Sequence, residues 1–139
     1  MPAPQPVLDA SALLAYLGDE PGAEAVAHAI SGGATLSAVN LAEALGTLAS
    51  RGARPAAVVG DLLARGLLAG AITVEPFTMA DAVEVARLRP LTRPAGLSLA
   101  DRACLALAGR LSSPALTADQ AWARLSLDVE IRLLREASA

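Results

Sequence analysis

The stretch Val7-Leu8-Asp9-Ala10-Ser11-Ala12-Leu13-Leu14 decides the fold class. Its first residues form a short apolar run that ends in a carboxylate, and a run with helical spacing follows at once and stops at Gly18. This pattern predicts a strand followed directly by a helix. Asp9 is therefore expected at the junction, where a strand ends and a helix begins.

The same alternation continues along the chain. We expect strands at 34–37, 71–75 and 114–117, and helices at 23–30, 38–50, 55–70, 78–90 and 98–111, followed by a short helix around Trp122. Pro90 is expected to end its helix, and 91–97 to form a loop. Residues 128–133 alternate as an edge strand would, with a terminal helix as the alternative. Strands that alternate with helices predict an α/β domain in three layers, α/β/α, around a central, mainly parallel sheet.

Length and composition agree with one domain over 1–139. The chain has 139 residues, a net charge of −3, and 54% hydrophobic but only 2% aromatic residues, which is typical of a globular domain with its own core. No apolar run reaches the roughly 18 residues that span a bilayer. The first residues lack the pattern of a secretory signal. We therefore expect a cytoplasmic protein with no membrane partner.

Several mechanisms are excluded by what the chain lacks. All eleven basic residues are arginines, and Cys104 and His28 are the sole members of their types. Without lysine there is no P-loop lysine and no Schiff base. A single Cys and a single His leave no disulfide and no zinc-finger set. Carboxylates are the remaining candidates for catalytic groups.

Four acids fall where the predicted strands lead into helices. Asp9 and Asp119 follow strands, Glu43 lies in the second turn of a helix, and Asp101 lies in the first turn of another. In a parallel sheet such positions converge at the carboxyl ends of the strands. Clustered carboxylates suit a hard cation such as Mg²⁺ or Mn²⁺. A metal-activated water then makes phosphodiester hydrolysis the natural chemistry.

Each acid also has a purely structural interpretation. Asp9 and Asp119 can cap the helices that follow them, and Ser98-x-x-Asp101 is a capping box. Glu43 can be an exposed residue of its helix. Their joint placement, rather than any single residue, favours a metal site.

Four blocks of the sequence carry a resemblance to a known family. They are 7–14 (VLDASALL), 36–43 (LSAVNLAE), 97–108 (LSLADRACLALA) and 116–122 (LTADQAW). In this order they resemble the signature blocks of PIN-domain ribonucleases, and more narrowly of VapC toxins of bacterial toxin–antitoxin pairs. The resemblance covers nearly the whole chain and includes the ending 129–135.

The resemblance implies an acidic quartet of Asp9, Glu43, Asp101 and Asp119 around Mg²⁺ or Mn²⁺. Asp9 and Asp101 would be direct ligands, and the other two would act through water, hold a second ion or orient the attacking water. Polar residues match positions beside these acids as supporting partners: Ser11, Asn40 and Thr117. Arginines cluster near the segment that leads to Asp101, where they could contact phosphates: Arg87, Arg89, Arg93 and Arg102.

The implied function is an endoribonuclease toxin with an RNA substrate. The implied partners are a VapB-like antitoxin protein and a second copy of the chain in a homodimer. The alternative function is a non-catalytic PIN-like binding module, whose acids are only caps and surface charges.

Overall fold

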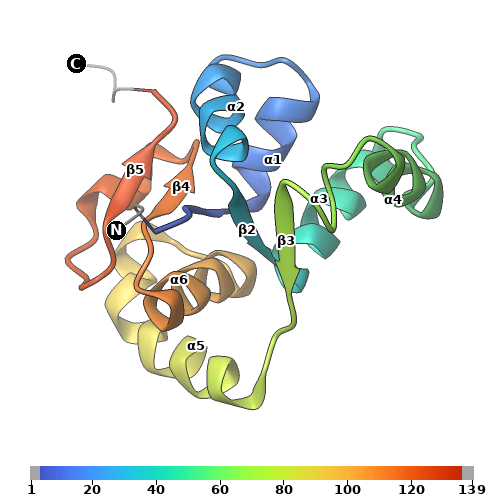
Figure 1. Ribbon diagram of the computed structural model, residues 1–139. Helices are drawn as coiled ribbons and strands as arrows, with labels where there is room; N and C mark the ends of the chain where they lie inside the picture. Colours follow the sequence, from blue (N-terminus) through green and yellow to red (C-terminus); the bar gives the residue numbers. More distant parts are fainter. Residues whose placement is uncertain (1–3, 136–139) are drawn as a thin grey trace.

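A five-stranded sheet forms the centre of the computed structural model, which describes residues 4–135 (Figure 1). The strand order is β3-β2-β1-β4-β5, and every neighbouring pair is parallel. The strands are β1 (Val7–Leu8), β2 (Ala34–Ser37), β3 (Ile72–Glu75), β4 (Ala115–Thr117) and β5 (Ile131–Leu133). The predicted parallel sheet is confirmed, and residues 131–133 form its edge strand rather than a helix.

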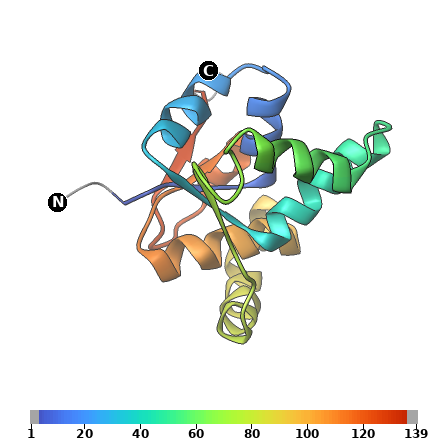
Figure 2. The same ribbon diagram turned by 45° about the vertical axis from the view of Figure 1, so that its right-hand side comes forward.

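Helices cover both faces of the sheet (Figures 1 and 2). They are α1 (Ala10–Leu17), α2 (Ala23–Ser31), α3 (Ala38–Ser50), α4 (Pro55–Ala64), α5 (Met79–Thr92) and α6 (Leu99–Leu111), with two short 3₁₀ helices, η1 (Arg93–Ala95) and η2 (Gln120–Arg124). The three-layer α/β/α architecture is therefore confirmed. None of the helices within residues 4–135 combines the length and the hydrophobicity that a membrane span requires. The prediction of a single domain over 1–139 extends to residues 1–3 and 136–139, which lie outside the described residues.

Two hydrophobic cores lie on opposite faces of the sheet. Successive residues of a strand point to opposite faces, and Val7 and Leu8 of β1 are both fully buried. Leu8 packs with Leu36 and Leu116 under α1 and α2, whereas Val7 packs with Ala115 and the inner side of α6. The sheet is thus held from both sides, which fixes the positions of its strand ends.

The fourth helix is shorter than the sequence predicts. We expected it to extend to Gly70, but α4 ends at Ala64. Gly66 adopts a φ of +73°, a conformation that glycine reaches without steric cost. The chain turns there, and Leu67 and Leu68 are buried before β3 begins. The helical prediction for residues 65–70 is therefore wrong.

The fifth helix is longer than predicted. Pro90 lies inside α5, which continues to Thr92, and η1 replaces part of the expected loop. A proline removes one backbone donor from a helix. The buried Thr92 hydroxyl donates to the Leu88 carbonyl at 2.9 Å, so the last turn keeps a hydrogen bond of its own. The prediction that the helix stops at Pro90 is wrong.

A partly buried ion pair joins the start of α5 to the end of α6. Arg110 donates through Nε and Nη2 to the Asp81 carboxylate at 3.0 and 3.3 Å. Asp81 also forms a capping box with Thr78. Burial opposes ionisation of Asp81, but the bonds from the Thr78 backbone, Arg110 and the Thr78 hydroxyl outweigh it and lower the pKa of this carboxyl.

Replacement of Asp81 by Asn tests this ion pair. We expect the free energy of unfolding to fall by about 1–2 kcal/mol at pH 7. Because the folded-state pKa is lowered, Asp81 stabilises the fold above its ordinary value of 3.8, and this contribution is lost as the pH falls through the lowered pKa. Urea unfolding at pH 7 and at pH 3 measures both effects.

The exposed pair of Asp61 and Arg65 provides the control. Asp61→Asn should change stability by less than about 0.5 kcal/mol. An Asp81→Asn variant as stable as the wild type at pH 7, or equally destabilised at both pH values, would contradict the account of Asp81.

Candidate metal centre

The predicted acids lie around the carboxyl ends of the strands. Asp9 directly follows β1, Asp119 follows β4, and Glu43 lies in α3, which begins directly after β2. Asp101 lies in the first turn of α6, which packs against β1, β2 and α3. The parallel register explains this arrangement because the ends of parallel strands meet at one edge.

Asp9 is the buried centre of this region, with 3% of the residue exposed. Its Oδ1 accepts hydrogen bonds from Ser11 Oγ at 2.7 Å and from the Ala12 amide at 2.8 Å, and its Oδ2 accepts one from Thr117 Oγ1 at 2.5 Å. All three donors are neutral. Burial raises the pKa of Asp9 against the effect of these bonds, and the negative charge of Asp101 raises it further.

Ser11 and Thr117 connect Asp9 to the segment that carries Asp119. Ser11 Oγ accepts a hydrogen bond from the Ala118 amide at 2.9 Å. Thr117 Oγ1 accepts one from the Asp119 amide at 3.0 Å while it donates to Asp9. The two hydroxyls thus hold the start of α1 and the end of β4 around the Asp9 carboxylate. Ser11 and Thr117 lie beside the predicted acids, as the sequence indicated.

Glu43 and Asp101 are electrostatic neighbours of Asp9. Partial burial raises the pKa of Glu43, and the charges of Asp101 and Asp9 raise it further. Asp101 accepts a hydrogen bond from the Ser98 amide at 2.9 Å, so its capping box is formed as well. None of the ion pairs within residues 4–135 involves these acids. Their mutual repulsion is therefore uncompensated by basic side chains.

Asp119 is exposed and caps η2, where its Oδ1 accepts from the Ala121 amide at 3.0 Å. As the side chains stand in the described part of the chain, no three His, Cys, Asp or Glu residues form a ligand set for one ion. The chemistry of the residues nevertheless fits a divalent cation. A buried carboxylate with only neutral donors is costly, and a hard cation relieves both that cost and the repulsion.

Two of the four predicted arginines are engaged in other contacts. Arg87 pairs with Glu84 on the same helix. Arg102 Nη1 donates to the Val85 carbonyl at 2.8 Å, and its Nε is buried with no partner in the part of the chain that the structure describes. Arg89 and Arg93 are exposed and have no ion pair within residues 4–135. Arg89 and Arg93 are therefore the two of the four that have neither an ion pair with a described residue nor a buried guanidinium.

A further exposed arginine was missed in the sequence. Arg124 lies on η2, which packs against η1, the element that begins with Arg93. Its position five residues after Asp119 is a signal that could have pointed to it. Arg93 and Arg124 thus lie on neighbouring segments, one leading to Asp101 and the other following Asp119.

Cys104 and Trp122 are core residues. Both are fully buried. Burial raises the pKa of the Cys104 thiol, and the charges of Asp9 and Asp101 raise it further. The thiol is therefore protonated and is no candidate for a nucleophile.

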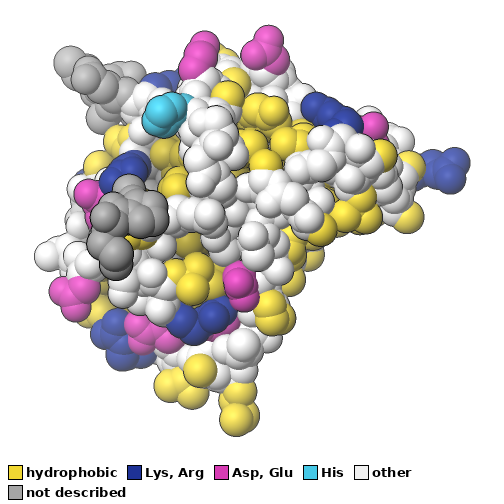
Figure 3. All heavy atoms as spheres, in the orientation of Figure 1, with side chains coloured by type: hydrophobic (Ala, Val, Ile, Leu, Met, Phe, Trp, Pro, Cys, Tyr) yellow, Lys and Arg dark blue, Asp and Glu magenta, His cyan; other side chains and the backbone are white. Residues whose placement is uncertain are grey.

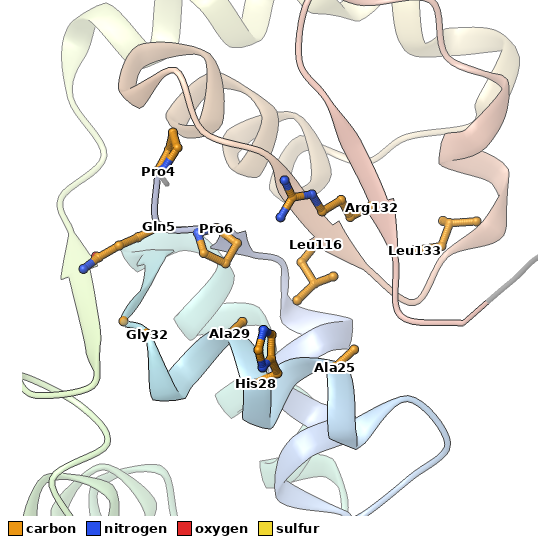
Figure 4. Close-up of a pocket in the computed structure, with 11 residues that line it drawn as sticks. Pro4, Gln5, Pro6, Ala25, His28, Ala29, Gly32, Leu116, Arg132 and Leu133 are labelled. Atoms are coloured by element: carbon orange, nitrogen blue, oxygen red, sulfur yellow. The ribbon is translucent and has the colours of Figure 1, made fainter. Parts of the chain in front are cut away.

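A cavity of about 380 Å³ lies beside α2 and the segment that precedes β1 (Figure 4). It is lined by His28 and other residues of α2, by the segment that precedes β1, and by Leu116, Arg132 and Leu133. His28 is exposed at its rim. None of the four predicted acids lines this cavity.

The chain is a three-layer α/β/α domain with a parallel sheet, and its predicted site consists of acids near the carboxyl ends of the strands. The family model of the PIN domain matches residues 7–127. The chain therefore belongs to the PIN domain family, whose members are generally nucleases.

Solved structures with the same fold include complexes of toxins with antitoxins. A toxin–antitoxin complex from Klebsiella pneumoniae is 13% identical, with a TM-score of 0.67, and covers 95% of this chain and 99% of that one. FitAcB from Neisseria gonorrhoeae is 23% identical, with a TM-score of 0.63 and coverage of 90% and 94%. DNA-bound VapBC from Salmonella typhimurium is 14% identical, with a TM-score of 0.66 and coverage of 93% and 97%. A comparison with curated proteins gave no match.

Proposed function

We propose that this chain is a metal-dependent endoribonuclease that acts in the cytoplasm as the toxin of a VapBC-type toxin–antitoxin pair. The PIN fold supports the nuclease class. The observation that carries the proposal is Asp9, a buried carboxylate with only neutral hydrogen-bond donors. The charge of Asp101 raises the pKa of Asp9, and the charges of Asp101 and Asp9 raise the pKa of Glu43.

In this proposal Asp9 and Asp101 hold Mg²⁺ or Mn²⁺ directly, and Glu43 and Asp119 act through water, hold a second ion or orient the attacking water. A bound divalent ion supplies a more acidic water and stabilises charge on the phosphate. Ser11 and Thr117 keep the Asp9 carboxylate in one orientation. Glu43, whose pKa is raised, is suited to take a proton from the attacking water at its carboxylate.

Incubation of the purified chain with single-stranded RNA tests the nuclease proposal. We expect internal cleavage with Mg²⁺ or Mn²⁺, loss of cleavage with EDTA, and recovery when Mn²⁺ is added back in excess. Cleavage that continues in EDTA would overturn the metal-dependent mechanism.

The capping bonds favour one alternative, a non-catalytic PIN-like binding module. Asp9, Asp101 and Asp119 each accept a backbone hydrogen bond that a helix cap explains. Under this alternative the chain binds RNA without cutting it at any concentration of Mn²⁺. The cleavage experiment therefore separates the two functions.

The RNA substrate is supported by exposed arginines, since the net charge of −3 does not favour a nucleic acid by itself. Arg93 and Arg124 have no ion pair within the part of the chain that the structure describes. Replacing both by Ala should weaken RNA binding. The slope of log K against log[salt] should become shallower by about 1.4 for single-stranded RNA, because two phosphate contacts are lost. Filter binding at several salt concentrations, with Asp9→Asn in every protein to prevent cleavage, measures this.

Arg51→Ala is the matched control, because Arg51 is exposed at the far end of α3. It should leave the RNA affinity and the salt dependence unchanged. If the Arg93 and Arg124 replacements have no larger effect than this control, RNA does not approach along η1 and η2.

The antitoxin partner and the homodimer are supported by exposed apolar side chains. Met79 and Val83 of α5 are 86% and 69% exposed, and Leu63 of α4 is 50% exposed. Figure 3 shows apolar atoms gathered at the lower tip of the molecule, where α5 begins. Light scattering of the purified chain tests the homodimer. Co-purification with the protein encoded beside its gene tests the antitoxin.

A further inference from the structure

Asn40 is a fully buried polar residue between two helices that carry acids. It lies in the first turn of α3, three residues before Glu43. Its Nδ2 donates to the carbonyl of Ala100 at 2.9 Å. Ala100 is the residue before Asp101 in α6. One side chain thus bonds the turn of α3 that precedes Glu43 to the turn of α6 that holds Asp101.

Stability alone does not explain an amide at this position. Asn40 Oδ1 is buried and has no hydrogen-bond partner among residues 4–135, and an unsatisfied buried acceptor costs about 1–3 kcal/mol. The Ala100 carbonyl lies in the first turn of α6, where the backbone N–H four residues later in the helix can donate to it. This carbonyl therefore does not need a side-chain donor for its own stability. An apolar side chain of similar size would avoid the cost at Oδ1.

We propose that Asn40 is a positioning residue, which fixes Asp101 relative to Glu43 by holding the Ala100 carbonyl. The metal-binding consequence rests on the proposed function, whereas the mechanical role does not. Asp101 itself hydrogen-bonds with Ser98 of its own turn. The placement of that turn against α3 therefore depends on packing and on the Asn40 bond.

Asn40→Leu removes the bond and also the unsatisfied oxygen. We expect Mn²⁺ affinity, measured by calorimetry, to fall about 10- to 100-fold, while the melting temperature stays equal or rises. In an Asp101→Asn background the same replacement should have little further effect on affinity, because Asn40 acts through Asp101. If Leu does not fit, Asn40→Ala removes the same bond without added volume.

The matched control is Thr92→Val, which also removes a buried side-chain hydrogen bond to a helix carbonyl. It should leave Mn²⁺ affinity unchanged. Amide hydrogen exchange provides a readout that needs no metal. Asn40→Leu should accelerate exchange at residues 101–104 at the start of α6, and Thr92→Val should not.

The outcomes separate this inference from the proposed function. If the wild type binds no Mn²⁺, the metal-dependent function fails, and the exchange at residues 101–104 still decides the role of Asn40. Unchanged exchange in both Asn40 variants would overturn the positioning role. If the wild type binds Mn²⁺ and Asn40→Leu binds it with the same affinity, the positioning role is also overturned.

Discussion

Asn in place of Asp9 is expected to lower Mn²⁺-dependent RNA cleavage by about 100- to 1000-fold, the usual effect of removing one group that stabilises charge in a transition state. Asn keeps the shape of the side chain but removes the negative charge that a divalent ion requires. The melting temperature should stay equal or rise, because Asp9 is a buried carboxylate whose donors are all neutral. Loss of activity without loss of stability is typical of a site that is strained for function.

Initial rates of cleavage and thermal unfolding of the same preparations measure the two effects of Asp9→Asn. Asp19→Asn is the control, since Asp19 is exposed and has a φ of 49°, which Asn tolerates well. It should change neither quantity. An Asp9→Asn protein that cleaves RNA at the wild-type rate would remove Asp9 from the mechanism.

Removal of the Trp122 side chain is expected to have the largest effect on stability. Trp122 lies in η2, is fully buried, and packs with the core formed by Val7, Leu105 and Ala115. Trp122→Ala should lower the free energy of unfolding by about 3–5 kcal/mol. Because the backbone N–H of Trp122 also bonds to the Asp119 carbonyl at 3.2 Å, the segment that holds Asp119 should loosen as well. Urea unfolding and amide exchange at residues 117–122 measure both effects.

Trp122→Phe is the informative comparison. Trp122 Nε1 is buried, and none of the described residues bonds to it, so Phe removes an unsatisfied donor while it keeps most of the apolar contact. We expect a loss of less than about half that of the Ala variant, because the residual cavity is smaller. Equal losses in the Phe and Ala variants would show that the indole, rather than apolar volume, supports this loop.

The sequence was sufficient to predict the layers of the fold, because apolar strand runs alternate with helices whose capping residues can be recognised. Asp9 caps the helix that follows β1, and Ser37 caps the helix that follows β2. The two wrong helix ends, those of α4 and α5, lie where the local sequence pattern and the packing of the folded chain favour different structures. Gly66 ends α4 early because the chain must turn to bury Leu67. Pro90 is tolerated because Thr92 is held by a buried bond beyond it.

For the candidate site, the sequence could predict which acids share an edge but not how they are held. The bond from Thr117 to Asp9 joins residues 108 positions apart, and the bond from Asn40 to Ala100 joins residues 60 positions apart. No local pattern specifies such contacts. Arg102 was predicted to contact phosphate because it belongs to the arginines near the segment that leads to Asp101, and in the structure its guanidinium donates to the Val85 carbonyl. Burial, which sequence position does not reveal, decides which charges remain accessible.

The proposed mechanism requires a divalent cation to bind at Asp9. The most direct test is a calorimetric titration of Mn²⁺ into the metal-free wild type and into Asp9→Asn under identical conditions. We expect saturable binding to the wild type that Asp9→Asn abolishes or weakens by at least about 10-fold. Equal binding to both proteins, or no binding to the wild type, would contradict it.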